Sequence, residues 1–367
     1  MNILHIDTEK YWRGGQQQVL YLHQGLTKRN INSLLVCSKS SELKNRCEKN
    51  NLPYFEITVF GEIDLFAAYR ISRVCKRNNI DIIQAHSAHA VTIGLLIKVF
   101  LPKLKLIAVR RVDFSVNKNF VSKFKYTNNK IDKIICISEF IKSVLIKDGI
   151  NESKLITIRS GVDINKFDGA EVPQDFRENL GVLKDEILIG TVAALAGHKD
   201  FPNLLKAFSI VVSKHKNVKL CIVGDGPMRD EITNIINELG ITERVLLLGY
   251  REDVGKYLKS LDIFVLASKK EGLGTSVIDA LAVGLPVVAT KAGGIPEIIK
   301  NDYNGILVET GNPQMLADGI LELVMNHTSR KQFSSTAVSS VAKFSIKNTI
   351  DQNVFEYEKL LGKKIDG

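Results

Sequence analysis

The sequence predicts an α/β protein with two doubly wound parallel sheets, one after the other along the chain. The length of 367 residues, with 45% hydrophobic and 25% charged residues, provides for a large core and favours two domains over one. Short β-branched or apolar runs alternate with longer amphipathic stretches, which is typical of βα units. The alternation stops near residue 160 and starts again after residue 185.

The first series supplies the strands and helices of one sheet. Amphipathic stretches at 15–29, 64–79 and 139–149 predict helices. The predicted strands are NILHI, SLLVC, DIIQA, LKLIAV, KIICIS and LITI. The following segment, RSGVDINKFDGAEVPQDF, gathers Gly, Pro and Asp, which is typical of a hinge.

The second series predicts another sheet of the same kind. Helices are expected at 201–214, 227–239, 253–260 and 275–283. The apolar runs between and after them are EILIGTVAAL, KLCIVG, RVLLLG, DIFVLAS, PVVAT, IPEII and GILV. We therefore expect domains at 1–165 and 166–345. Ligands of open α/β sheets bind beyond the carboxyl ends of the strands, so two facing domains predict a cleft between them.

Cysteine use and hydropathy indicate a cytoplasmic protein. The five cysteines are spread along the chain without a C-x-x-C pair, which favours a reducing compartment. The first predicted strand begins at the second residue, which leaves no room for a signal peptide in this sequence. No run of about 18 apolar residues, as a membrane span requires, follows it. We expect neither secretion nor a membrane span.

The positive charge lies in the first half of the chain. Residues 1–165 hold 26 Lys and Arg against 14 Asp and Glu, whereas residues 166–367 hold 24 against 26. Between Lys98 and Lys133, ten basic residues are interleaved with aromatic ones. A solvated basic face and a surface that docks on anionic lipid both remain open. A nucleic-acid patch is the third interpretation, but no nucleic-acid motif accompanies it, so we expect no nucleic-acid partner.

Two glycine-rich loops follow predicted strands. Gly14 and Gly15 precede a helix whose amides suit a phosphate or sugar, although a flexible turn explains them equally well. The loop VGDGPMRD lacks the dinucleotide pattern G-x-G-x-x-G. Pro227 suits the first position of a helix, so we assign Gly224 to Pro227 a structural role.

The loops LAGHK and KKEGLGTS carry the strongest chemical signal. Lys199, beside His198, follows a strand and suits a diphosphate, or else is a solvated loop lysine. Glu271 precedes a glycine turn, and the helix that starts at Thr275 has free amides for a phosphate. Asp279, eight residues after Glu271, either completes a capping box with Ser276 or borders the same ligand. Both carboxylates suit sugar or ribose hydroxyls.

The segment from Phe264 to Ile299 resembles the retaining glycosyltransferases of family 4. Their hallmark is E-x7-E, followed by a strand of the form A-x-x-x-G-x-P-V-V-A-T and a G-G-x-x-E turn. Here Glu271 and Asp279 give E-x7-D, followed by Gly284, Pro286 and AGGIPE. Further motifs occur in the family's order, namely the GG pair, DIIQAHS, KIICISEF, SGVDINKF, VGDGPMRD, LLGYREDV and DGILELV.

The resemblance implies a GT-B architecture of two Rossmann-like domains, with the sugar-nucleotide donor held mainly by the second. It also implies that the segment 346–367 forms a helix, at about 348–361, that returns to the first domain. Glu271 would bind the hydroxyls of the donor sugar, and Asp279 the ribose. The other implied donor contacts are Lys199 and His198 with the diphosphate, Gly272, Leu273, Gly274, Thr275 and Ser276 with sugar and diphosphate, Gly14 and Gly15 with phosphate, and Tyr250 and Arg251 with the base.

Three positions depart from the family pattern. Asp279 is one methylene shorter than the usual Glu. Ala194 stands where a basic residue normally accompanies Lys199, so His198 or an Arg of the first domain would have to compensate. Arg110 and Arg111 follow a strand where many members place a His near the sugar; with His86 they are candidates for binding phosphate or an acceptor.

The resemblance predicts transfer of a sugar from a nucleoside diphosphate with retained anomeric configuration. Glu271 and Lys199 would act on the reacting groups, and closure about residues 160–170 would assemble the site. We expect no metal and no cofactor beyond the nucleotide sugar, because no D-x-D or metal-ligand cluster is evident.

The acceptor is expected to be a saccharide or a lipid-linked saccharide. The first half of the chain carries the excess of positive charge, with apolar side chains among the basic ones. This suggests that the enzyme binds peripherally at the anionic inner face of the plasma membrane, as in lipopolysaccharide, capsule or glycolipid assembly. Two alternatives stay open: a non-catalytic GT-B partner that binds sugar nucleotides, which Ala194 favours, and a nucleotide-sugar epimerase.

Overall fold

The computed structural model describes residues 1–362 and contains two compact units. The first consists of residues 1–161 together with the C-terminal stretch that begins at Ile346, and the second of Val162–Ser345. The chain enters the second unit after Gly161, slightly earlier than the expected boundary at residue 165. Residues 363–367 of the expected C-terminal segment lie outside the described residues.

The first unit is built on a parallel sheet of seven strands in the order β3-β2-β1-β4-β5-β6-β7. The order reverses between β1 and β4, and the carboxyl ends of strands at such a reversal are where ligands of open α/β sheets bind. The strands are β1 (Asn2–Asp7), β2 (Asn32–Ser38), β3 (Tyr54–Ile57), β4 (Ile82–Ala85), β5 (Lys105–Arg110), β6 (Lys133–Cys136) and β7 (Leu155–Thr157).

Side chains that follow the strands start several helices of this unit. Asp64, Ser87 and Ser138 each accept a hydrogen bond from a first-turn amide, which fixes where α3, α4 and α6 begin. The helices are α1 (Gly14–Lys28), α2 (Glu42–Lys49), α3 (Leu65–Arg77), α4 (Ala88–Phe100), α5 (Phe120–Thr127), α6 (Glu139–Lys147) and α14 (Ile346–Leu360).

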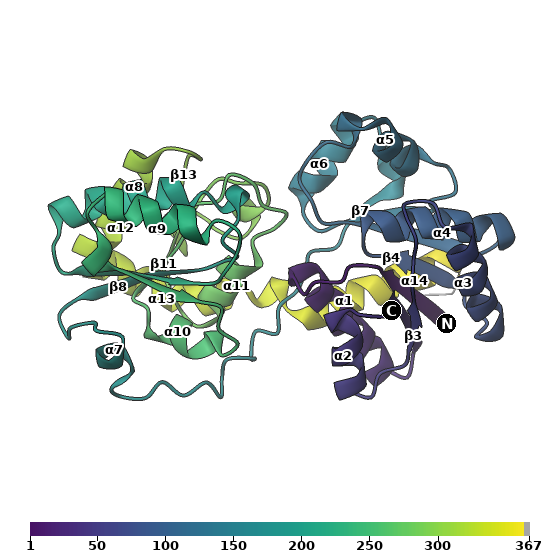
Figure 1. The fold of residues 1–367 in the computed structure, drawn as a ribbon, viewed down its shortest axis with the longest axis horizontal. Coiled ribbons are helices and arrows are strands. Elements are labelled where there is room, and N and C mark those ends of the chain that lie inside the picture. The colour runs from purple at the N-terminus through teal and green to yellow at the C-terminus, as the bar shows by residue number, and fades with distance from the viewer. Residues whose placement is uncertain (363–367) are drawn as a thin grey trace. The chain divides into compact units, whose positions relative to one another are not determined.

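Helix α14, the last helix among residues 1–362, belongs to the first unit (Figure 1). It packs on α1, where Gly25 allows the close approach: a Cβ there would lie 2.2 Å from Ile350 Cδ1. Asn353 accepts a hydrogen bond of 3.2 Å from Gln84 of β4, and the Tyr357 hydroxyl donates to the same Gln84. These buried polar contacts join the end of the chain to the middle of the first sheet.

The second unit repeats the topology with six parallel strands in the order β10-β9-β8-β11-β12-β13. Its order reverses between β8 and β11. The strands are β8 (Ile187–Val192), β9 (Val218–Val223), β10 (Val245–Gly249), β11 (Ile263–Leu266), β12 (Val287–Thr290) and β13 (Gly305–Val308). Both sheets have the strand order of Rossmann-like domains, as predicted.

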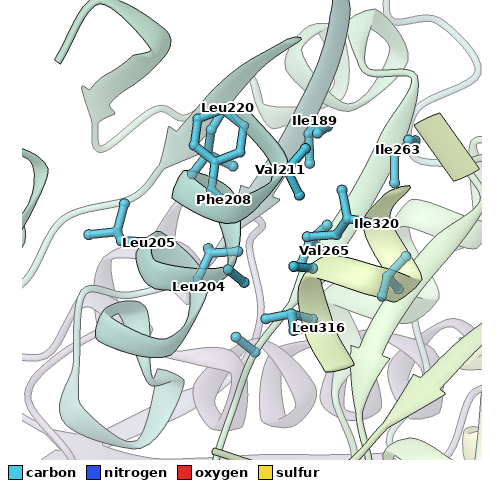
Figure 2. Packing of buried hydrophobic residues seen from close by; sticks show 14 of the residues in the cluster. Ile189, Leu204, Leu205, Phe208, Val211, Leu220, Ile263, Val265, Leu316 and Ile320 are labelled. Atoms are coloured by element: carbon cyan, nitrogen blue, oxygen red, sulfur yellow. The ribbon is translucent and has the colours of Figure 1, made fainter. Parts of the chain in front are cut away.

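Helices cover both faces of the second sheet, with α8, α9 and α12 on one and α10 and α13 on the other (Figure 1). Phe208 of α8 and Ile320 of α12 pack with strand residues such as Val265 in a fully buried cluster (Figure 2). The helices are α7 (Phe176–Asn179), α8 (Phe201–Lys214), α9 (Arg229–Glu238), α10 (Val254–Ser260), α11 (Thr275–Ala282), α12 (Pro313–Met325) and α13 (His327–Ser340).

Two local predictions were wrong. Pro227 does not open a helix: it lies in a turn, and α9 starts at Arg229. The run IPEII forms no strand, because Ile295–Glu297 is a short 3-10 helix. Among residues 1–362, no helix has the length and apolar character that spanning a membrane requires.

Candidate active site

The two loops at the reversal point of the second sheet meet at their side chains. The loop after β8 contains a 3-10 turn, Gly197–Lys199, and the loop after β11 carries Ser268 and Glu271. Lys199 Nζ forms an ion pair with Glu271 Oε1, and Ser268 Oγ donates to the same oxygen at 3.0 Å. We call Lys199, Ser268 and Glu271 the second-unit cluster.

The second-unit cluster is largely shielded from solvent. The side chains of Lys199 and Glu271 are only 14% and 10% exposed. Ser268 is fully buried, and its carbonyl accepts a hydrogen bond of 2.6 Å from Thr290 Oγ1 at the end of β12. A cation and a carboxylate are therefore held at the carboxyl edge of the sheet, where a strongly polar ligand fits.

Backbone contacts fix both loops. The Lys269 amide donates to the His198 carbonyl at 2.8 Å, and Lys269 Nζ lies 2.9 Å from Asp200 Oδ1. Gly293 of the AGGIPE turn lies against Glu271: a Cβ at this glycine would be 1.7 Å from the Glu271 carbonyl oxygen. The glycine is therefore required for the turn to reach the loop that carries Glu271.

Helix α11 begins beside this cluster. Its N-cap is Gly274, with φ of 97°, a left-handed conformation that favours glycine. The alternative interpretation of Ser276 and Asp279 as a capping box is therefore wrong, since Ser276 is already the second helical residue and the N-cap, Gly274, has no side chain. Thr275 and Ser276 are half-buried, and their amides at the start of α11 can donate to an anion, whereas the Val277 amide already donates to the Gly274 carbonyl at 3.0 Å.

Asp279 pairs with a lysine that the sequence did not single out. Lys166 Nζ lies 2.7 Å from Asp279 Oδ1, and the Asp279 side chain is 21% exposed. Burial raises the pKa of this carboxyl, and the Lys166 charge acts in the opposite direction. Both acids of the E-x7-D pattern are thus paired with lysines of the same unit.

The remaining predicted residues of this unit lie elsewhere on the same sheet. Tyr250 and Arg251 follow β10, which is the edge strand, and both are exposed. Ala194 follows β8, and its carbonyl accepts a hydrogen bond of 2.8 Å from the Ala196 amide. Near Lys199, a second basic side chain is supplied by Lys269, which pairs with Asp200.

A separate cluster forms at the reversal point of the first sheet. Asp7 ends β1 and is fully buried; its Oδ1 accepts from the Glu9 amide at 2.9 Å, and its Oδ2 from Gln16 Nε2 at 3.1 Å. Burial raises the Asp7 pKa to about 6. Gly14 and Gly15 open α1 beside Gln16, and a Cβ at Gly15 would lie 3.4 Å from Arg111 Cδ.

Arg111 and His86 complete this first-unit cluster. Arg111 Nη2 lies 3.4 Å from His86 Nδ1, and Nη1 donates to Ser160 Oγ at 3.3 Å. A guanidinium only donates, so His86 Nδ1 accepts. Burial lowers the pKa of His86 and of His5, so both are neutral at pH 7. His86 therefore donates from Nε2 to His5 Nδ1, over 3.0 Å.

The Nε donor of Arg111 is unused. Its Nε is buried without a hydrogen-bond partner among the described residues. Burial lowers the Arg111 pKa to about 10, so the side chain stays cationic at neutral pH. The cluster thus places a restrained guanidinium at the start of α1, where helix amides also favour an anion.

Arg110 does not join Arg111 and His86, with which it was predicted. Its Nη2 donates to the Phe114 carbonyl at 2.6 Å, and its guanidinium lies over the rings of Phe114 and Tyr126. Successive residues of a strand point to opposite faces, which separates Arg110 from Arg111. Its contacts hold the loop after β5.

No role at a site was predicted for Asp7, Lys166, Ser268 or Gly293. Asp7 had a signal, because it ends the first strand directly before the loop with the paired glycines. Ser268 similarly ends the run DIFVLAS. Lys166 lies in the motif SGVDINKF, but nothing in the sequence indicated its partner, because more than 100 residues separate it from Asp279 and no periodicity relates them.

Two family models match the chain. The model for glycosyltransferase family 4 matches residues 12–166, and the model for glycosyl transferases group 1 matches residues 173–339. The chain is 30% identical over 298 residues to an uncharacterised glycosyltransferase of Methanocaldococcus jannaschii, which covers 77% of this chain and 76% of the relative.

A further relative and a solved structure agree with this assignment. The chain is 24% identical over 325 residues to the Escherichia coli UDP-Gal:alpha-D-GlcNAc-diphosphoundecaprenol alpha-1,3-galactosyltransferase, covering 84% of both chains. The fold is similar to that of Anabaena HepE in complex with UDP and glucose, with a TM-score of 0.85, 22% identity, and 98% and 99% of the two chains covered. The chain belongs to glycosyltransferase family 4 and has the GT-B fold.

Proposed function

We propose that the chain transfers a sugar from a nucleoside diphosphate to a lipid-linked saccharide, with retention of anomeric configuration. The observation that carries the proposal is the second-unit cluster, which holds Lys199 and Glu271 at the reversal point of the sheet beside the open amides of α11. A cation and helix amides suit a diphosphate, and a carboxylate suits sugar hydroxyls.

Each group has one task in this proposal. Lys199, aided by His198 and the α11 amides, stabilises the charge that develops on the leaving diphosphate. Glu271 orients the donor sugar, and Asp279 the ribose. In the first unit, Arg111 with the amides of Gly14 and Gly15 binds a phosphate of the donor or acceptor. Tyr250 and Arg251 border the base.

Retention of configuration is supported by the contacts of Glu271, Asp279 and Asp7, whose carboxylates are already engaged in ion pairs or hydrogen bonds. An inverting transfer requires a general base that is free to accept the acceptor's proton. Glu271 and Asp279 are both paired with lysines, and both oxygens of Asp7 already accept hydrogen bonds. We infer that the leaving phosphate takes the proton on the face where the acceptor attacks, and that no metal is required.

The lipid-linked acceptor is supported by the activity of the Escherichia coli relative, whose acceptor is a diphosphoundecaprenol-linked sugar. It is also supported by a surface of the first unit that we call the α5 surface, which carries exposed aromatic side chains beside exposed lysines. Its residues are Phe60, Ile63, Phe66, Lys118, Phe120, Val121, Lys123 and Phe124.

A buried lysine joins the two segments of the α5 surface. Lys125 Nζ lies 2.6 Å from Glu62 and donates to the Ala88 carbonyl at 2.9 Å, so it is not a surface cation. Phe60 and Phe120 are 75% and 81% exposed. Exposed rings beside lysines fit the interface of an anionic bilayer, and we propose peripheral binding there.

The test combines donor binding with product stereochemistry. The protein is titrated with UDP, GDP, ADP and CMP and with their common sugars, and the stabilising donor is then incubated with a diphosphoundecaprenol-linked N-acetylglucosamine acceptor in the presence of EDTA. An α-linked product from an α-linked donor, seen by NMR, supports the proposal. A β-linked product overturns retention, and a modified sugar that remains on the nucleotide indicates an epimerase.

A further inference from the structure

Lys166 is held in one orientation by two contacts. Its Nζ lies 2.7 Å from Asp279 Oδ1, and the same ammonium lies 4.6 Å from the centre of the Phe167 ring. The side chain is only 27% exposed. These two contacts, with a carboxylate and with an aromatic face, already restrain the ammonium, so its side chain loses little conformational freedom when a ligand binds nearby.

The backbone that carries Lys166 is also fixed. Phe167 packs on α10 at Gly255, where a Cβ would lie 2.8 Å from Phe167 Cδ1. Lys259 of α10 donates to the carbonyls of Asp168 and Ala170 at 3.3 and 3.0 Å. The segment after the unit boundary is therefore attached to the second unit, and it presents Lys166 to Asp279 as part of that unit.

The two oxygens of Asp279 have different surroundings. Oδ1 is buried and faces Lys166, whereas the carboxyl as a whole is partly exposed. Oδ2 is therefore the oxygen available to a ligand. The Lys166 charge opposes the effect of burial, which disfavours the ionised carboxyl. An ionised carboxylate is the stronger hydrogen-bond acceptor for hydroxyl groups.

We propose that Lys166 is a positioning residue for the nucleotide, holding Asp279 so that its Oδ2 accepts hydrogen bonds from the ribose hydroxyls. This inference rests on the proposed function, in which Asp279 binds the ribose. It also accounts for the short side chain: an aspartate with one oxygen fixed presents the other in a single place. Lys166 itself does not contact the nucleotide.

The experiment compares nucleotides with and without ribose hydroxyls. Calorimetric titrations use UDP and GDP, each beside its 2′,3′-dideoxy analogue, on the full chain. The variants are Lys166→Met, Lys166→Arg, Asp279→Asn and the double variant Lys166→Met with Asp279→Asn. The control is Lys214→Met, which removes another lysine of the second unit from its pair with Asp318, 3.8 Å away.

The proposal expects Lys166→Met to weaken the preferred nucleoside diphosphate about tenfold and its dideoxy analogue less than twofold. Lys166→Arg should retain most of the difference in affinity between the nucleotide and its dideoxy analogue. In the Asp279→Asn background, Lys166→Met should cause no further loss of affinity. Equal losses for both nucleotides, or no loss for either, overturn the positioning role. If the unaltered protein binds no nucleotide, the proposed function fails and this inference with it.

Discussion

Lys199 and Glu271 neutralise each other in the ligand-free chain, with Ser268 as a third partner on the same carboxylate oxygen. In the proposed function, a bound donor uses both groups, the lysine for its diphosphate and the carboxylate for its sugar. Under that proposal, donor binding exchanges this ion pair for two contacts with the ligand.

The exchange predicts that Glu271→Gln separates binding of the nucleotide from binding of the sugar. Without the carboxylate, Lys199 has no competing anion, so UDP binds as tightly as before or more tightly. The extra affinity of UDP-sugar over UDP disappears, because the charge-assisted acceptor is lost, and transfer falls at least about a hundredfold. Calorimetry with UDP and UDP-sugar measures both effects.

Glu309→Gln is the matched control, since it removes an exposed glutamate paired with Lys291 at 2.6 Å in the same unit. Its affinities should equal those of the unaltered protein. A tenfold loss of UDP affinity in Glu271→Gln would contradict the exchange.

Gly293→Ala should disrupt the loop that carries Glu271. The new Cβ would lie 1.7 Å from the Glu271 carbonyl oxygen, and φ at this position is 52°. We expect a loss of at least about 2 kcal/mol in unfolding free energy beyond the strain of a left-handed alanine, together with loss of the nucleotide-induced thermal shift.

Gly311→Ala is the control that separates left-handed backbone strain from steric contact. Gly311 has φ of 68°, but the space around its Cβ position is open. This variant should lower stability only by the left-handed strain, about 1 kcal/mol, and retain the nucleotide response. Equal behaviour of the two variants would show that the close contact at Gly293 has no consequence.

The raised pKa of Asp7 predicts in which direction the stability of the protein changes with pH. The folded protein keeps the Asp7 proton up to about pH 6, whereas the unfolded chain releases it near pH 3.8. The folded state binds more protons between these values, so the Asp7 contribution to stability falls as pH rises through this window. The difference corresponds to about 3 kcal/mol.

Asp7→Asn should therefore gain stability relative to the unaltered protein between pH 4.5 and 7, by about 2 kcal/mol after the altered hydrogen bond to Gln16 is allowed for. Trp12, the one tryptophan of the sequence, reports unfolding of the first unit by fluorescence. The buried neutral histidines act in the opposite direction but are common to both proteins. A difference that is constant with pH contradicts the assignment.

Binding to anionic vesicles should depend on the α5 surface. Lys118→Glu with Lys123→Glu should weaken binding to phosphatidylglycerol vesicles by more than about tenfold, since each lysine near such a surface contributes about 1 kcal/mol. Phe120→Ser with Phe124→Ser should weaken it as well, because the rings would no longer enter the interface. Vesicle flotation measures both changes.

Lys214→Glu with Lys216→Glu, two exposed lysines of the second unit, makes the same charge change and should leave flotation unaltered. Lys125 is left intact, because its reversal would break the buried pair with Glu62. No preference for anionic over zwitterionic vesicles would remove the membrane from the proposed function.

The fold was predictable because local pattern and topology agreed. Alternating apolar runs placed every described strand except β3, and amphipathic stretches placed helices such as α8, whose bounds 201–214 were predicted as found. No range was predicted for α2, α4, α5, α7, α12 or α13. The errors arose where a short sequence motif is compatible with two local structures. Ser276 and Asp279 have capping-box spacing, yet the glycine before them adopts the left-handed conformation and becomes the cap.

The site was predictable where its residues lie next to strand ends, and not where distant segments meet. Lys199 and Glu271 both follow strands that are neighbours in the sheet, so topology brings them together. The pairing of Glu271 with Lys199, the pairing of Asp279 with Lys166, and the separation of Arg110 from Arg111 all depend on side-chain directions that one-dimensional spacing does not contain.

The position of α14 has a consequence for synthesis of the chain. The second unit is a continuous stretch, Val162–Ser345, and all of it is translated before α14. The first unit begins earlier but lacks the partner of Gln84 until Asn353 and Tyr357 are made. The half of the molecule that is translated first is therefore completed last, and a nascent first unit must keep the face of α1 that receives Ile350 uncovered until α14 has been made.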